Sequence, residues 1–265
     1  KLGRKNTLIW IGILYFISAV GSGLAPDPYT FSIFRFIGGV GVGASSVAAP
    51  TYISEITSSK NRGKFVALYQ FMLVFGILIA FISNYLLAGF DGANDWRWML
   101  GVEAIPAFIY ILFVLGVSQS PRWLCLKKGD EAGALKILQV IDPDTANQRL
   151  KEIEEDIESD KDAPSVFSKR YSFPILLAFL LAVFNQLSGI NFILYYAPEL
   201  LEMAGLAAKD SLFNSISIGG INLIFTMLGL YYIDRLGRRT LMLIGSIGYI
   251  LSLSMTAYSF YAGVN

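Results

Sequence analysis

The chain of 265 residues is 54% hydrophobic and 15% charged, and its mean hydropathy of +0.55 exceeds what a soluble core of this size needs. Its net charge is +1, it has no histidine, and Cys125 is its single cysteine. These counts exclude an intrachain disulfide, histidine metal ligands and histidine-based triads, and the net charge gives no reason to expect nucleic acid as a partner. Because the sequence shows neither a nucleophile paired with a base nor a metal cluster, we expect an all-α membrane protein that is not an enzyme and needs no cofactor or metal.

Seven apolar runs are long enough to cross a bilayer, since a spanning helix needs about 20 residues. They cover residues 7–25, 29–50, 65–88, 98–117, 173–197, 212–233 and 240–262. Between the fourth and fifth runs, the charged segment predicts a turn at Asp142–Asp144, a short helix over 130–140 and an amphipathic helix over 147–159. The expected domains are four spans in 1–117, a helical linker outside the bilayer in 118–170, and three spans in 171–265.

Basic residues gather on one side of these spans. Of the 21 Lys and Arg, 18 lie before the first span, between the second and third, in the linker, or between the sixth and seventh. Arg97 and Lys209 fall on the other side, and Arg35 lies within a span. The positive-inside rule predicts a multi-pass protein of the plasma (inner) membrane with cytoplasmic basic loops. We expect Arg35 to face the bundle interior, although it could also extend outward to the interface.

A basic turn occurs twice. Leu2-Gly3-Arg4-Lys5 recurs as Leu236-Gly237-Arg238-Arg239, with an offset of 234 residues, and each copy precedes an apolar span on the same predicted side. This pattern indicates two copies of one unit in parallel orientation, which is a transporter architecture.

The stretch Asn185–Pro198 is polar although it lies in an apolar run. It holds three carboxamides, and such groups are costly in hydrocarbon unless they find partners. At 100° per residue, a straight helix would place Asn185 and Asn191 on one face and turn Gln186 away. Gln186 and Asn191 can therefore share a ligand only if the helix opens near Gly189. We expect a broken helix that lines a cavity for a neutral polar solute.

Glu55 and Arg62 flank the short turn between the second and third spans. As a solvated surface pair they would contribute about 0–1 kcal/mol. Alternatively they belong to a latch, a charge network that holds one conformation and breaks in the other.

Six motifs occur together in a family-specific order and spacing. They are Gly3-Arg4-Lys5, Arg35 with Gly38–Gly43, Pro50–Ile56 with Arg62-Gly63, Ser120–Leu124, Asn185–Pro198 and Asp234–Arg239. Over essentially its whole length the chain resembles the sugar porter family of the major facilitator superfamily. The resemblance implies a partial major facilitator-type helical bundle, a fragment like spans three to nine of twelve, with a cytoplasmic helical linker between the halves. It further implies transmembrane transport of a monosaccharide, a hexose or pentose, by alternating access.

The resemblance also implies which residues bind sugar. In that family carboxamides hold the sugar, and by position these are Gln70, Asn185, Gln186, Asn191 and Asn222. A carboxamide both donates and accepts hydrogen bonds, which suits the hydroxyls of a small neutral sugar. Gln70 and Asn222 could instead form interhelical hydrogen bonds worth about 1 kcal/mol. Asn185 stands where the family usually has a glutamine.

The latch of the family is carried over in the same way. Its candidate residues are Arg4, Lys5, Arg35, Glu55, Arg62, Arg122, Asp234, Arg238 and Arg239. Gln119 stands where the family has an acid near Arg122, so we expect that arm of the latch to be neutral and weaker. We expect Glu103, near the outer end of its span, to pair with Arg97.

Two other functions fit the same fold: a sugar sensor that does not translocate, and a porter for polyols or organic acids. An acid carrier would need fixed positive charge near the site, and the run over 173–197 has none. Coupling to H⁺ is left open, because in the family it depends on a carboxylate of the first span. The expected partners are a small neutral sugar and the lipid bilayer.

Overall fold

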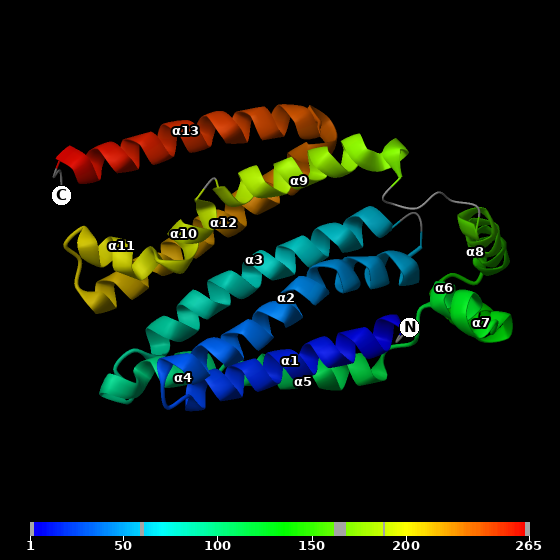
Figure 1. The fold of residues 1–265 in the computed structure, drawn as a ribbon, viewed down its shortest axis with the longest axis horizontal. Coiled ribbons are helices and arrows are strands. Elements are labelled where there is room, and N and C mark those ends of the chain that lie inside the picture. Colours follow the sequence, from blue (N-terminus) through cyan, green and yellow to red (C-terminus); the bar gives the residue numbers. More distant parts are fainter. Residues whose placement is uncertain (1–2, 59–60, 162–167, 188, 263–265) are drawn as a thin grey trace. The chain divides into compact units, whose positions relative to one another are not determined.

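The computed structural model describes residues 3–58, 61–161, 168–187 and 189–262, and throughout this part the regular structure is helical, without a strand (Figure 1). The chain divides into two compact units. Unit 1 comprises Lys1–Tyr69 and Gly89–Ala163, and unit 2 comprises Gln70–Ala88 and Pro164–Asn265.

Unit 1 contains the first transmembrane helices and the charged segment. Its elements are α1 (Arg4–Leu24), α2 (Pro28–Ile56), the start of α3 (Arg62–Leu87), η1 (Gly92–Asn94), α4 (Asp95–Gly101), α5 (Ala104–Gly116), α6 (Pro121–Trp123), η2 (Leu124–Lys128), α7 (Glu131–Ile141) and α8 (Ala146–Lys161). Helix α1 packs along α2, α4 and α5, as Figure 1 shows for α1 beside α5. A core of Leu8, Ile11, Tyr52 and Val114 is buried where α1, α2 and α5 meet.

Local sequence sets the start of α2. Asp27 is its N-cap, and Pro28 follows as the first helical residue. The Asp27 carboxylate accepts hydrogen bonds from the backbone N–H groups of Tyr29 and Thr30 at 2.9 Å. The Thr30 hydroxyl also donates to this carboxylate, at 2.7 Å, and this hydrogen bond, followed by the backbone ones, lowers the pKa of the Asp27 carboxyl. The helix continues through Pro50 to Ile56, beyond the predicted end at residue 50, because a membrane helix tolerates an internal proline.

Glycines let α1 and α2 approach closely. A Cβ on Gly41 would lie 3.1 Å from the Tyr15 ring, and one on Gly38 would collide with Ser18. The glycine run of the second span therefore serves helix packing at these two positions.

The two copies of the basic turn have the same backbone conformation. Gly3 has φ 79° and ψ 155°, and Gly237 has φ 78° and ψ 152°. This region is accessible essentially to glycine alone. Each glycine carbonyl then accepts the backbone N–H four residues on, from Thr7 at 3.1 Å and from Leu241 at 3.3 Å. The repeat found in the sequence is thus a repeat of local structure.

Unit 2 contains the remaining helices. They are the later part of α3, η3 (Lys169–Tyr171), α9 (Ser172–Leu187), α10 (Ile190–Tyr195), α11 (Ala197–Met203), α12 (Ala208–Leu236) and α13 (Arg238–Ala262). Helices α3 and α12 run antiparallel, because the Tyr85 ring lies 5.5 Å from that of Phe213 and a Cβ on Gly219 would lie 2.9 Å from Phe81.

Most of the predicted spans and the linker helices are confirmed. Among the described residues, six helical segments are long and apolar enough to cross a membrane: Arg4–Leu24, Pro28–Ile56, Gly63–Leu87, Gly92–Gly116, Ala208–Ile233 and Arg239–Ser259. The expected helices over 130–140 and 147–159 are α7 and α8, joined by a turn over 143–145. The run over 173–197 is the exception, because it is divided among α9, α10 and α11.

Candidate functional site

The interruption of the 173–197 run lies at Gly189. Helix α9 ends at Leu187, Gly189 has φ 83° and ψ 1°, and α10 begins at Ile190. This left-handed conformation costs other residues about 1–2 kcal/mol, so glycine is the residue that permits it. The predicted opening of the helix near Gly189 is confirmed.

The interruption brings two predicted sugar-binding residues together. Asn191 Nδ2 donates a hydrogen bond to Gln186 Oε1 at 2.7 Å. A straight helix would have turned these two side chains apart, so their contact is a consequence of the left-handed residue between them. The bond leaves the two donors of Gln186 Nε2 and the acceptor Asn191 Oδ1 for a solute.

Asn185 lines a different surface of unit 2. It borders a cavity of about 1080 Å³ between α9 and α13, whose other polar walls come from Ser246, Tyr249 and Ser254. The two adjacent carboxamides at the end of α9 therefore face different parts of unit 2. Asn185 lines the cavity on α13, and Gln186 meets Asn191.

Gln70 of α3 is exposed, and Asn222 of α12 is partly buried. Gln70 is eleven residues from Phe81, about three full turns, and Asn222 is one turn from Gly219. The antiparallel register of the two helices puts Asn222 level with Gly76. Gln70 then lies about 9 Å further along the axis, at 1.5 Å per residue. This offset is too long for a direct hydrogen bond between Gln70 and Asn222.

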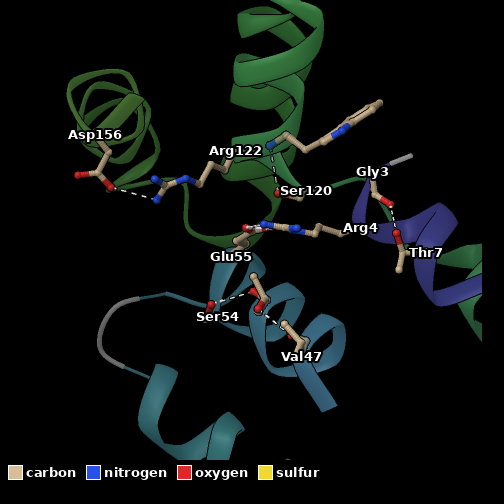
Figure 2. Close-up of polar contacts among 11 residues, drawn as sticks. Gly3, Arg4, Thr7, Val47, Ser54, Glu55, Ser120, Arg122 and Asp156 are labelled. Atoms are coloured by element: carbon tan, nitrogen blue, oxygen red, sulfur yellow. Dashed lines mark hydrogen bonds and ion pairs between the residues drawn. The ribbon is translucent and has the colours of Figure 1, made fainter. Parts of the chain in front are cut away.

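Four candidate latch residues of unit 1 lie at one end of it, which we call the basic end: the start of α1, the ends of α2 and α5, and α6. They are Arg4, Lys5, Glu55 and Arg122. Arg4 Nη2 lies 3.1 Å from Glu55 Oε1, and Arg4 Nε donates to both carboxylate oxygens at 3.3 Å (Figure 2). The Glu55 side chain is 11% exposed and that of Arg4 is 45% exposed. Lys5 Nζ donates to the Leu115 carbonyl at 2.8 Å. Leu115 lies in the last turn of α5, and the C-terminal end of a helix stabilises a nearby cation.

Arg122 pairs with a carboxylate of a later helix of the linker. Its Nη1 lies 3.1 Å from Asp156 Oδ2 of α8, and Figure 2 shows the two side chains directed toward one another. Gln119, the neutral residue expected to weaken this arm, donates to Asn6 Oδ1 at 3.5 Å.

Two residues that attach α8 to the rest of unit 1 were not predicted from the sequence. Arg149 is buried and donates from Nη2 to the carbonyl of Thr57, the C-cap of α2, at 2.8 Å. Asp156 lies two turns further along α8 on the same face. The sequence held a signal for the position of Arg149, because it precedes Ile153 by four residues and so shares the apolar face of the helix.

The expected pairing of Glu103 with Arg97 is wrong. Glu103 Oε2 lies 3.2 Å from Arg35 Nη1, and both border a cavity of about 440 Å³ among α1, α2 and α5. Arg97 instead donates to the Gly23 carbonyl at 3.2 Å and lies over the Trp96 ring, 4.5 Å from its centroid. Arg35 thus turns toward its neighbouring helices, as expected of a charge within a span. It is not among the contacts of the basic end.

The remaining latch candidates, Arg62 at the start of α3 and those of the second repeat, are only partly described. The side chains of Arg62, Asp234 and Arg238 lie outside the described residues. Arg239 is exposed at the start of α13.

In the linker, burial raises the pKa of the Cys125 thiol, and the carboxylates of Glu154 and Glu131 add to that rise. The thiol is therefore protonated near neutral pH.

Comparison with known proteins gives consistent matches. A family model described as "Sugar (and other) transporter" matches residues 1–265. The D-xylose-proton symporter of Escherichia coli (strain K12) is 33% identical over 285 residues, which cover 98% of this chain and 58% of the relative. The arabinose-proton symporter of Bacillus subtilis (strain 168) is 35% identical over 270 residues, with the same two coverages. The major myo-inositol transporter IolT of B. subtilis (strain 168) is 32% identical and covered to 54%.

Solved structures agree with the family match. The xylose transporter XylE from E. coli, in a partially occluded inward-open conformation, matches with a TM-score of 0.88 at 32% identity, over 100% of this chain and 63% of that chain. Another XylE structure, described as a major facilitator superfamily proton:xylose symporter bound to 6-bromo-6-deoxy-D-glucose, matches with a TM-score of 0.83. The chain thus spans somewhat more than half the length of the relatives it matches. It belongs to the sugar transporter family of the major facilitator superfamily.

Proposed function

We propose that the protein moves a small neutral monosaccharide across a membrane by alternating access, and that unit 2 carries part of its binding site. The observation that supports this most strongly is the Gln186–Asn191 hydrogen bond across the interruption at Gly189. Discontinuous helices line the substrate sites of many transporters, because their unwound backbone and side chains face a cavity.

The chemistry of these side chains suits a sugar. Gln186 and Asn191 together offer donors and an acceptor without a charge, and sugar hydroxyls need both. We assign Gln70 and Asn222 to the same pathway, since their offset of about 9 Å leaves room for a solute between them. We place Asn185 at its edge, toward α13.

We further propose that transport is coupled to H⁺ and that the Glu103–Arg35 ion pair takes part in the coupling. A carboxylate beside Arg35 within the spans is a costly arrangement that functional sites retain. Loss of the negative charge at position 103 would break the ion pair and release Arg35.

The basic end of unit 1 is the proposed cytoplasmic side of a plasma (inner) membrane protein. The pairs Arg4–Glu55 and Arg122–Asp156, together with Lys5, would stabilise the outward-open state there. Arg62, Asp234, Arg238 and Arg239 are proposed to join the same latch.

Counterflow of labelled sugars in proteoliposomes that carry the intact protein tests the function. We expect exchange of D-xylose, L-arabinose or D-glucose without a pH gradient, and accumulation when an inward H⁺ gradient is imposed. Binding of a sugar without counterflow would indicate a sensor of the same fold. Counterflow of myo-inositol but of no aldose would indicate a polyol porter, a possibility that the similarity to IolT keeps open.

A further inference from the structure

Two hydrogen bonds join α1 to the segment formed by α4 and α5, one near each end. At the basic end, Lys5 Nζ donates to the Leu115 carbonyl at 2.8 Å. At the opposite end, Arg97 Nη1 donates to the Gly23 carbonyl at 3.2 Å. The chain covers the same 18 residues from Lys5 to Gly23 as from Arg97 to Leu115, about 27 Å of helix at 1.5 Å per residue. Because the hydrocarbon core of a bilayer is about 30 Å thick, the two contacts mark its two faces.

Exposed aromatic side chains gather at the face that the Arg97 contact marks. Trp96 and Trp98 flank Arg97 in α4, Phe90 lies in the loop before α4, and all three rings are exposed. Figure 1 shows α4 beside the end of α1 that lies far from the N-terminus. A cluster of exposed rings is unfavourable in water, so it indicates a surface that contacts another apolar or interfacial phase.

The two tryptophans also contact charged groups. Trp98 Nε1 donates to Asp91 Oδ2 at 3.1 Å, and its ring meets that of Phe90 edge to face, with 5.5 Å between the centroids. The guanidinium carbon of Arg97 lies 4.5 Å from the centroid of the Trp96 ring. Rings that are apolar over most of their surface and bound to a charged group at one side suit the membrane–water interface, where tryptophan is enriched.

The carboxylates of this end exclude a position deeper in the bilayer. Asp91 is exposed, and its backbone N–H donates to Asp95 Oδ1 at 2.6 Å, which holds the loop against the start of α4. A carboxylate within the hydrocarbon core costs several kcal/mol, so these two residues need water. The level at which the carboxylates reach water while the rings leave it is the headgroup region.

We propose that Phe90, Trp96 and Trp98 form an anchor in the headgroup region of the bilayer, at the face opposite the basic end. The partner is a lipid surface, and the rings would lie among the headgroups and the first carbons of the acyl chains. The anchor would fix the depth of α4 and, with it, the start of α5 at its N-cap Glu103. The proposal concerns the position of the chain in the bilayer and does not depend on the solute that is carried.

The test measures the quenching of tryptophan fluorescence in proteoliposomes that carry the intact protein. One variant keeps only Trp96 and Trp98, with every other tryptophan replaced by phenylalanine. The control keeps only Trp10, which is also exposed but lies about 8 Å inside the Lys5 contact, toward the middle of the bilayer. The quenchers are lipids brominated near the headgroup, lipids brominated near the ends of the acyl chains, and acrylamide in the water.

We expect lipids brominated near the headgroup to remove about half of the emission of Trp96 and Trp98, and the other two quenchers to remove less. The Trp10 variant should not share this preference for shallow bromine. Stronger quenching of Trp96 and Trp98 by acrylamide would place their rings in water, and stronger quenching by bromine at the chain ends would place them in the hydrocarbon core. Either result overturns the proposal, as does an absence of quenching or the same preference in the two variants.

Discussion

Asn191 donates to Gln186 across a helix interruption, at 2.7 Å and five residues apart. In a continuous helix a five-residue separation turns two side chains about 140° apart, so this contact requires the left-handed Gly189 between them. The arrangement of the candidate sugar site therefore depends on the backbone conformation at Gly189. The backbone and the carboxamides can be altered by separate substitutions.

Gly189→Ala tests the backbone. No atom lies within 4 Å of a Cβ at this position, so the substitution acts through the left-handed conformation alone, at a cost of about 1–2 kcal/mol. We expect sugar affinity to fall about tenfold, as measured by binding of labelled sugar to purified protein. Gly220→Ala on α12, where a Cβ also meets nothing, is the control. Equal affinity in the two variants would show that the interruption does not support the site.

Glu55→Gln tests the latch at the basic end. It removes the charge that Arg4 contacts at 3.1 Å, and a partly exposed pair of this kind contributes about 1 kcal/mol. The inward-open population should rise about fivefold. The measurement is the rate at which an outside maleimide labels Asn222→Cys in a Cys125→Ser background, which should decrease. Glu158→Gln on α8 is the control, and an unchanged labelling rate in Glu55→Gln would count against the latch.

Glu103→Gln tests proton coupling. The amide carries no charge and cannot form the ion pair with Arg35, so we expect sugar accumulation driven by a pH gradient to be lost while counterflow continues. Uptake with and without the gradient, measured in the same proteoliposomes, separates the two. Glu202→Gln on α11 should accumulate sugar like the wild type. Retained accumulation in Glu103→Gln would remove this residue from the coupling mechanism.

Arg149→Ala tests the attachment of the linker. The change removes a buried, charged donor from the C-cap carbonyl of α2, a hydrogen bond worth about 1.5–3 kcal/mol. The midpoint of thermal unfolding should therefore decrease, whereas Lys151→Ala on the exposed side of α8 should leave it unchanged. A midpoint equal to that of Lys151→Ala would mean that α8 is held by its other contacts.

Much of the fold follows from periodicity and charge. Apolar runs gave the helices, and the recurrence of Gly3 at Gly237 gave a repeat that the backbone angles reproduce. Such features are local, because each depends on a few consecutive residues.

Partners between distant segments were harder to predict. Glu103 pairs with Arg35, 68 residues away, and not with the nearby Arg97. Arg122 likewise meets Asp156 of α8. Which charges meet depends on how helices pack, and hydropathy does not encode that. The site lies between these cases: the carboxamides and Gly189 were visible, but which carboxamide turns toward Asn191 depends on the angle of the interruption.

The most direct test of the account is sugar binding by Gln186→Ala in the intact protein, measured by titration of labelled sugar against Asn214→Ala. Asn214 is a carboxamide of α12 that donates to its own helix, to the Asp210 carbonyl at 2.9 Å. With both variants inserted in the membrane like the wild type, Gln186→Ala should lose at least tenfold in affinity and Asn214→Ala should lose none. Wild-type affinity in Gln186→Ala would contradict the assignment of the interrupted helix as the sugar site.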